Sequence, residues 1–268
     1  MSISQHAREQ YGDASNLDAR IALHARFSRN AVAWFPWVFD RLTLPDGARV
    51  LELGCGPAKL WRENLTRIPD WDVTLTDLSA GMIAEAEAQL RNAPHPFTFA
   101  VVNAEELPFD DGAFDAVIAS HMLYHVPDLP QVLSEVRRVL KPGGRLFAAT
   151  NGREHMRELD ALSQDVVAGG VVSAFARNDH LTDFTLETAP GHFHPYFPRV
   201  TLHRPEGDPD LYVTEAAPLV AYILSVTPHH VREDAQKVAA LRERVDGALA
   251  ASGEVRVTRA TGLFEAWL

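Results

Sequence analysis

The segment from residue 50 to residue 61 reads VLELGCGPAKLW and changes character twice. It begins as an apolar strand that carries one acid, Glu52, and it ends as a helix. Between the two, Gly54, Gly56 and Pro57 form a turn with few side chains. Glycines let a backbone approach a ligand closely and adopt dihedrals that other residues resist, and the following helix offers unpaired N–H groups. This segment therefore predicts a ligand-binding turn at the end of a buried strand.

The sequence around this turn alternates short apolar strands with amphipathic helices. Strands are predicted at 49–53, 72–76, 97–102, 114–119 and 145–150, and helices at 59–67, 79–91 and 129–140. This alternation predicts right-handed crossovers and a parallel sheet with helices on both faces. Ligands of such sheets bind beyond the carboxyl ends of the strands, where the strand order reverses. The glycine turn falls at that place.

The remaining segments predict additions to this core. Residues 1–45 predict a helical N-terminal lid, residues 46–150 the core, and residues 151–252 an inserted α+β cap. Residues 253–268 predict the final strands, an antiparallel hairpin turning at Gly262 on the sheet edge. The expected fold is therefore an α/β, Rossmann-like, seven-stranded and mostly parallel sheet with an antiparallel C-terminal hairpin, a lid and a cap.

The composition narrows the class of protein. The chain has 268 residues, a formal net charge of −11 and no cluster of Lys and Arg, which argues against a nucleic-acid partner. The single Cys55 cannot form an intramolecular disulfide. The N-terminus has no apolar core of signal-peptide length, and the apolar runs are too short for a bilayer. We expect a soluble cytoplasmic protein with no membrane partner, and the oligomeric state stays open.

Three interpretations of the glycine turn compete. A dinucleotide site would want a third glycine at position 59, where this chain has Lys59, and the Glu52 carboxylate would repel a pyrophosphate. The same carboxylate suits a ligand that carries an ammonium and a sulfonium group, as S-adenosylmethionine (SAM) does. The third interpretation is a structural turn beside a salt-bridged acid.

Six sequence segments, of which the glycine turn is the first, bear on this choice. They read VLELGCGP (50–57), TLTDLS (74–79), NAEELPF (103–109), FDAVIAS (114–120), MLYHVPD (122–128) and VLKPGG (139–144). In this order the chain from about 48 to 150 resembles the class I SAM-dependent methyltransferases, specifically the small-molecule branch similar to ubiquinone- and menaquinone-biosynthesis enzymes. The resemblance implies SAM as the cofactor and methyl transfer to a small molecule. Residues 11–20 and 23–24 are also similar, more weakly, to the lid segment of one subgroup.

The resemblance implies roles for individual residues. Gly54 and Gly56 would lie under the methionine part of SAM, Glu52 near its positively charged end, and Asp77 would accept hydrogen bonds from the ribose hydroxyls. The other implied cofactor-binding residues are Cys55, Leu78, Met82, Asn103, Ala104, Glu105 and Ser120, of which Leu78 and Met82 would flank the adenine and Asn103 and Ala104 its edge.

Two positions depart from the family pattern, and two roles have structural alternatives. Ala58 replaces the usual third glycine, and Asn103 stands where Asp is usual but keeps an acceptor for the adenine amino group. Asp77 could instead cap the helix that starts near Ser79, and Met82 could be core.

The transfer itself requires alignment of nucleophile, methyl and sulfur, and for some acceptors a base. The predicted catalytic residues are His121, His125 and Tyr11, with His155, His192 and His194 of the cap as further candidate bases. No metal is expected, because the histidines at 121 and 125 lack an HExxH context. An aromatic or apolar substrate is expected from the aromatic residues Tyr11, Trp34, Trp37, Phe175, Phe193, Tyr196, Phe197 and Tyr222, about half of which would be core.

The sequence leaves O-, N- and C-methylation open. Two other functions also remain: a catalytically silent SAM-binding protein and, with less support, a nicotinamide-dependent oxidoreductase.

Overall fold

The computed structural model describes residues 22–164, 166–167, 170–171, 183–227 and 229–268. Its centre is a seven-stranded sheet in the order β3-β2-β1-β4-β5-β9-β6. The strands are β1 (Arg49–Leu53), β2 (Asp72–Asp77), β3 (Phe97–Val101), β4 (Phe114–Ser120), β5 (Leu140–Asn151), β6 (Arg199–His203) and β9 (Thr261–Trp267). Strands β1 to β5 pair in parallel, whereas β9 pairs antiparallel with both β5 and β6 and is the reversed strand of the sheet. The predicted Rossmann-like, mostly parallel sheet is confirmed.

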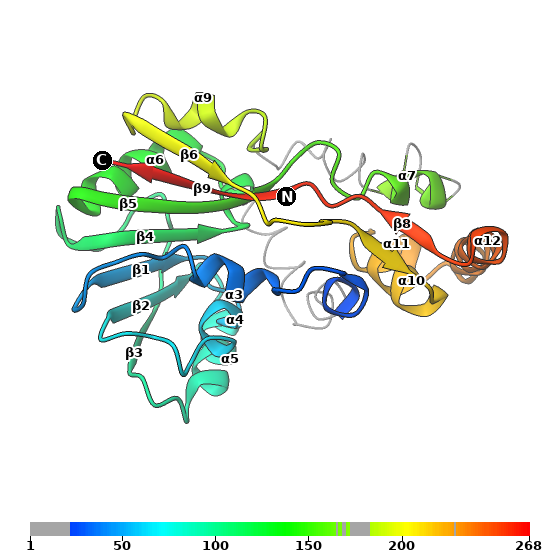
Figure 1. Ribbon diagram of the computed structural model, residues 1–268, viewed down its shortest axis with the longest axis horizontal. Coiled ribbons are helices and arrows are strands. Elements are labelled where there is room, and N and C mark those ends of the chain that lie inside the picture. Colours follow the sequence, from blue (N-terminus) through cyan, green and yellow to red (C-terminus); the bar gives the residue numbers. More distant parts are fainter. Residues whose placement is uncertain (1–21, 165, 168–169, 172–182, 228) are drawn as a thin grey trace.

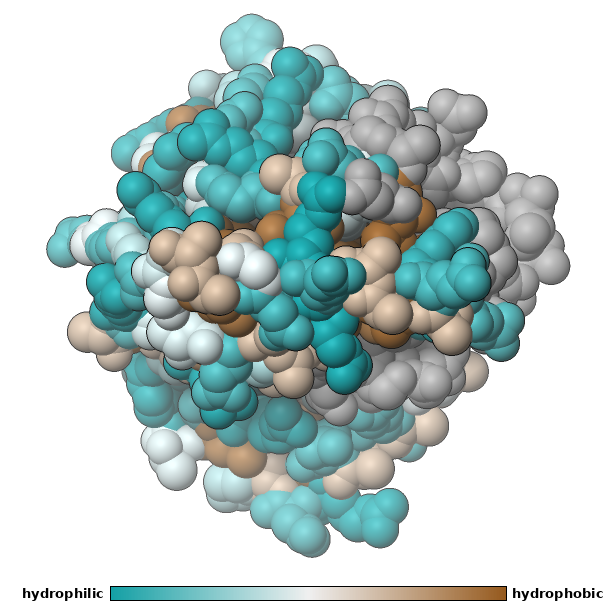
Figure 2. Space-filling model, turned by 90° about the vertical axis from the view of Figure 1, so that its right-hand side faces the viewer, coloured by the Kyte–Doolittle hydropathy of each residue, from teal (hydrophilic) through white to brown (hydrophobic). Residues whose placement is uncertain are grey.

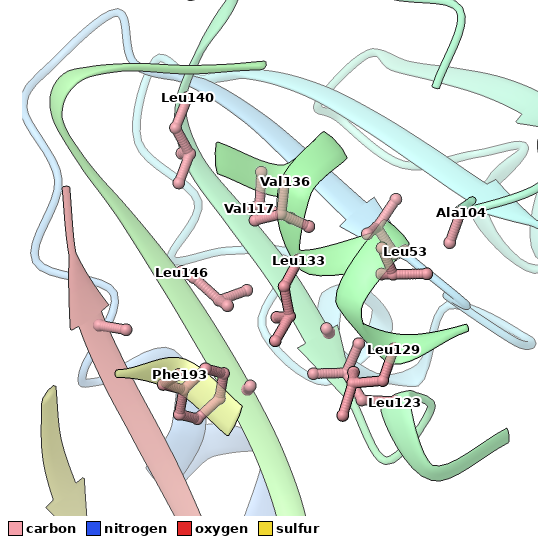
Figure 3. Packing of buried hydrophobic residues seen from close by; sticks show 14 of the residues in the cluster. Leu53, Ala104, Val117, Leu123, Leu129, Leu133, Val136, Leu140, Leu146 and Phe193 are labelled. Carbon is pink, nitrogen blue, oxygen red and sulfur yellow. The ribbon is translucent and has the colours of Figure 1, made fainter. Parts of the chain in front are cut away.

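Helices cover both faces of this sheet (Figure 1). One face carries α3 (Trp34–Phe39), α4 (Lys59–Arg62) and α5 (Ala80–Leu90), and the other carries α6 (Leu129–Val139) and α9 (Ala189–Phe193). Helix α6 shows why such helices form: Asp128 accepts the N–H of Gln131 as the N-cap. Its apolar residues at a spacing of three and four, which include Leu129, Leu133 and Val136, point into the core beside Val117 and Leu146 (Figure 3).

The C-terminal strands differ from the predicted hairpin. Strand β8 (Val255–Val257) pairs with β7 (Leu211–Val213) in a separate two-stranded sheet, while β9 enters the main sheet between β5 and β6. The prediction of a hairpin on the sheet edge was therefore wrong, because the apolar patterns of two consecutive strands do not say whether they pair with each other. The edge strand β6 comes from the segment predicted as a cap, and the predicted domain boundaries stay predictions.

A third hydrophobic cluster lies beyond the carboxyl ends of the strands (Figure 1). It joins α7 (Glu158–Ser163), α10 (Ala216–Ser225) and α12 (Ala235–Ser252) to β7 and β8, and residues 22–27 add a helical turn. The short helices η1 (Leu123–His125) and α11 (His229–Arg232) complete the described elements. Figure 2 views the molecule from this end, where hydrophilic residues dominate the visible surface and smaller hydrophobic patches lie near the centre. Among the described residues, none of the helices combines the length and apolar composition that crossing a membrane requires.

Candidate functional site

A cavity of about 640 Å³ opens where the strands β1, β2 and β4 end. Its size falls in the range of about 300–1,000 Å³ that small-molecule sites occupy. The predicted site residues that line it are Glu52, Gly54, Cys55, Gly56, Asp77, Leu78, Met82, Asn103, Ala104, Ser120, His121 and His125. Glu105 does not line it, since its carboxylate accepts the backbone N–H of Asp128 and a side-chain N–H of Asn103. Tyr11 lies outside the described residues, so its catalytic role stays a prediction.

The two glycines of the turn, Gly54 and Gly56, share a backbone conformation but differ in what surrounds them. Gly54 has φ 64° and Gly56 has φ 53°, both in the left-handed region that disfavours side chains. A Cβ atom on Gly54 would come within 2.8 Å of the Met122 Cβ, so this glycine allows close packing. A Cβ atom on Gly56 would meet no atom within 4 Å, so this glycine leaves bare backbone facing open space. Ala58 follows at φ 56°, which shows that the turn tolerates one methyl group in this conformation.

Glu52 is a buried carboxyl group with no cationic partner among the described residues. Its side chain is held by Trp61, whose Nε1–H donates to Glu52 Oε2 at 2.6 Å. Burial, together with the nearby Asp77, raises the pKa of Glu52 to about 8, against the lowering effect of the Trp61 hydrogen bond. Among the described residues, no cation forms the salt bridge to Glu52 that the structural alternative requires. Trp61 was missed from the sequence, where it looked like an ordinary apolar helix residue.

Asp77 ends strand β2 beside this carboxyl group. Its two oxygens accept the backbone N–H groups of Gly56 at 3.0 Å and Ser79 at 2.8 Å. Burial raises its pKa, although these hydrogen bonds oppose the shift. Ser79, rather than Asp77, caps α5 by accepting the N–H of Met82. Asp77 therefore braces the glycine turn, and each of its oxygens keeps a lone pair for a ligand.

The residues expected around an adenine ring lie along the same end of the cavity. Leu78 is partly exposed, whereas Met82 is buried and also contributes to the cavity wall. Asn103 Oδ1 accepts the backbone N–H of Glu105, which fixes its amide. Ala104 packs in the core beside Leu53 (Figure 3) and also faces the cavity.

The opposite end of the cavity gathers basic side chains from distant parts of the chain. His24, His121, His155 and Arg259 all line it. The rings of His24 and His155 stack with centroids 6.1 Å apart, and that of His121 lies 5.6 Å from Trp34. Burial lowers the pKa of His24 to about 3 and that of His121 to about 4, and it lowers the pKa of His155 as well; in each case the Arg259 charge adds to the effect. These imidazoles are therefore neutral at neutral pH.

The predicted catalytic histidines lie beyond the end of β4. His121 has φ 57°, and its backbone N–H donates to the carbonyl of Ala149, so the residue is firmly placed in an unusual conformation. His125 lies in η1 with its ring 4.5 Å from that of Tyr124. Of the aromatic residues expected in the pocket, Trp34, Trp37 and Tyr222 line the cavity, whereas Phe193 and Phe197 are fully buried core. Arg259 was not found from the sequence, because it belongs to no motif, and His24 was noted only within the weak lid similarity, without a role in the site.

The strand order, the glycine turn and the paired acids agree with the class that the sequence resembles, the class I SAM-dependent methyltransferases. The sequence model of the family described as "Methyltransferase domain" matches residues 51–148, and this segment of the chain belongs to that family. The chain is 32% identical over 171 residues to the ubiquinone/menaquinone biosynthesis C-methyltransferase UbiE of Geobacter sulfurreducens, covering 60% of this chain and 64% of that protein. It is 36% identical over 115 residues to the malonyl-[acyl-carrier protein] O-methyltransferase of Magnetococcus marinus, covering 43% and 42%. The chain thus spans less than two thirds of each of these relatives.

Solved structures share the fold at lower sequence identity. The [4+2]-cyclase SpnF aligns with a TM-score of 0.60 at 16% identity, and the match covers 100% of this chain and 97% of that one. A phosphoethanolamine N-methyltransferase of Haemonchus contortus aligns with a TM-score of 0.61 at 19% identity, covering 100% of this chain and 60% of that one. At such identities the likeness shows the fold alone, and function has to be argued from the site.

Proposed function

We propose that this protein binds SAM at the acidic end of the cavity and transfers its methyl group to a small molecule held at the other end. The observation that carries the proposal is the buried Glu52 carboxyl group, which has no cationic partner among the described residues and lies near a second acid, Asp77. A buried carboxylate is costly unless a cation compensates it. A cationic ligand at this end would supply that compensation, whereas a pyrophosphate would increase the cost.

The residues at this end fit the proposed cofactor. The open space over Gly56 leaves room for a ligand against bare backbone, and the free lone pairs of Asp77 would accept the ribose hydroxyls. Leu78, Met82 and Asn103 would hold the adenine. When bound, SAM supplies a methyl group already activated by a sulfonium.

The chain's own residues then have to align the acceptor and exclude water. His121 and His125, which follow the end of β4, are proposed to do this. A neutral His121 with a low pKa is a weak base, which favours acceptors that arrive without a proton to lose. The two relatives named above are a C- and an O-methyltransferase, so the acceptor atom is part of what an assay must identify. We also propose a cytoplasmic protein without a nucleic-acid partner, on the basis of its charge and its single cysteine.

The proposal is tested by calorimetric titration with SAM and with NAD. Asp77→Ala is expected to weaken SAM binding by about 1–3 kcal/mol, because buried ribose hydroxyls lose their acceptor. Asp72→Ala is the matched control, since Asp72 starts the same strand, is exposed and pairs with Arg49. An unchanged affinity in Asp77→Ala would remove Asp77 from the site, and tighter binding of NAD would favour an oxidoreductase.

Turnover is measured separately. Labelled SAM and a metabolite extract should yield S-adenosylhomocysteine together with a product that is heavier by one methylene group. Tight SAM binding without either product would instead indicate a silent SAM-binding protein. A changed metabolite without methyl incorporation would indicate a reaction other than methyl transfer. The cyclase SpnF, named above, has a similar fold.

A further inference from the structure

The basic end of the cavity contains a half-buried guanidinium group that has no carboxylate partner among the described residues. Arg259 lies in the link between β8 and β9, and among the described residues its side chain forms one hydrogen bond, to the Ser28 hydroxyl at 3.4 Å. Its Nε atom is buried without a hydrogen-bond partner, and no acid among the described residues forms an ion pair with it. Asp210 accepts the backbone N–H of Arg259 but directs its ion pair to Arg256. A partly desolvated charge left in this state favours an anionic ligand.

The groups around Arg259 add neutral hydrogen-bond donors. The Nδ1 atom of His155 accepts the backbone N–H of Ala260, so the proton of this neutral ring is on Nε2. The Oδ1 atom of Asn151 accepts the Thr261 hydroxyl at 2.6 Å, which leaves the amide nitrogen as a donor. The side chains of Asn151, His155, Arg259 and Thr261 all line the cavity. Among the described residues, this end therefore offers the positive charge of Arg259 and several neutral donors.

The link that carries Arg259 is fixed on both sides. Thr258 donates its backbone N–H and its hydroxyl to the two oxygens of Glu158, at 2.8 and 2.6 Å. The carbonyls of Thr258 and Ala260 accept the backbone N–H groups of Met156 and Gly152. Since each residue of the link is hydrogen-bonded to another element, the guanidinium is held in place before any ligand arrives.

We propose that this end is the acceptor subsite and that it takes a small aromatic or apolar carboxylic acid whose carboxylate binds Arg259. The inference rests on the proposed function and names its substrate class. A guanidinium matches a carboxylate in geometry and charge. Among the described residues that line the cavity, the other cation, Lys59, is paired with Glu63, so Arg259 balances one negative charge rather than the two of a phosphate monoester. Trp34, Tyr222 and Met156 supply apolar walls for the rest of the acceptor. Among the described residues, no three His, Cys, Asp or Glu side chains are grouped so that they could hold a metal ion, so the histidines do not form an alternative metal site.

The test compares acids with their amides. The protein is saturated with S-adenosylhomocysteine and titrated with benzoate, 3-phenylpropanoate and octanoate, each beside its primary amide, and with phenyl phosphate. At least one acid is expected to bind ten or more times tighter than its amide. Arg259→Met should abolish that preference, and Arg259→Lys should restore part of it. The matched control is Arg199→Met, because Arg199 is exposed on β6 with its guanidinium over the Trp267 ring.

The affinity for S-adenosylhomocysteine separates the two proposals. If neither SAM nor S-adenosylhomocysteine binds the wild-type protein, the proposed function fails. If both bind equally well to wild type and Arg259→Met while no acid is preferred to its amide, the acceptor subsite alone is overturned. Tighter binding of phenyl phosphate than of benzoate, or an acid preference that survives in Arg259→Met, would also overturn it. Should Arg259→Met fail to fold, the comparison of acids with amides in the wild type decides.

Analysis of labelled products distinguishes two arms. A methyl label released as methanol by mild base would show that the carboxylate itself is methylated. A base-stable label on an acid would show that the carboxylate only anchors the substrate while another atom reacts. A base-stable label on acceptors that carry no carboxylate would contradict the proposal.

Discussion

The two ends of the cavity differ in charge and in how the chain builds them. Glu52 lies one residue before the end of β1, and Asp77 ends the adjacent parallel strand β2. The residues that hold them, Trp61 and Ser79, lie within the same stretch of sequence. The basic end draws His24, His121, His155 and Arg259 from segments up to 235 residues apart in sequence numbering, from residue 24 to residue 259. The cofactor half is therefore built from neighbouring segments of the sequence, whereas the acceptor half forms only after distant segments of the chain have folded together.

The opposite charges also give the two ends different tasks. The acidic end suits a sulfonium and an ammonium group, and the basic end suits a carboxylate, so each ligand is repelled from the wrong end. Glu52 is buried and Asp77 and Arg259 are half-buried, so salt should screen these charges less than it screens fully exposed ones. The difference between the two ends can be tested by changing the pH, by adding single methyl groups at the glycine turn and by counting the protons that SAM binding releases.

The largest expected effect is on stability at acid pH. The pKa of His121 is about 4 in the folded protein against an ordinary value of 6.5, so the unfolded chain takes up the proton first. Stability should therefore fall as the pH drops from about 6.5 to about 4, by about 2–3 kcal/mol for this residue. Glu52, with a raised pKa of about 8, acts in the opposite direction and costs stability as the pH rises from about 4.5 to about 8.

Denaturant unfolding at pH 7.5 and pH 4.5 measures this difference. His121→Asn should remove about 2–3 kcal/mol of the loss between the two pH values, because asparagine does not titrate and tolerates a positive φ. The control is His194→Asn, at an exposed position that does not line the cavity. Equal losses in the wild type and in His121→Asn would show that the basic end does not carry the buried neutral imidazole described here.

A smaller effect separates the two glycines of the turn. Gly54→Ala should destabilise the protein by at least about 1–2 kcal/mol, since its Cβ would clash with Met122 in addition to the cost of a positive φ. Gly56→Ala should carry only the cost of the positive φ but should weaken SAM binding, because its Cβ enters the open space over the turn. Unfolding free energies and SAM affinities of the two variants check this, and a reversed pattern would place the cofactor elsewhere.

The cofactor half could be predicted from sequence because its determinants are local. The apolar strand before Gly54, the acid at its centre and the second acid at the end of the next strand all follow from periodicity and spacing, and Glu52, Asp77 and Met82 do line the cavity. Trp61 could have been noticed as a large residue with one donor, placed on the helix that follows the turn.

The acceptor half could not be predicted in the same way. Arg259 occupies the cavity wall because Glu158, Asp210 and His155 fix the link between β8 and β9, and these contacts span 100, 49 and 105 residues. The pairing of β9 between β5 and β6 has the same origin, since its partners are remote in the sequence. Periodicity identifies a strand but does not identify its neighbour.

The number of protons released on SAM binding is the most direct test that Glu52 belongs to a cation-binding site. At pH 7 a carboxyl group with a pKa of about 8 is mostly protonated, and a cation bound beside it should lower its pKa and release up to about 0.9 proton. Titration calorimetry at pH 7 in buffers with different ionisation enthalpies measures that number. We expect a release close to this value in the wild type and much less in Glu52→Gln, which keeps an acceptor for Trp61. No proton release, or the same release in both proteins, would contradict a cation-binding site at Glu52.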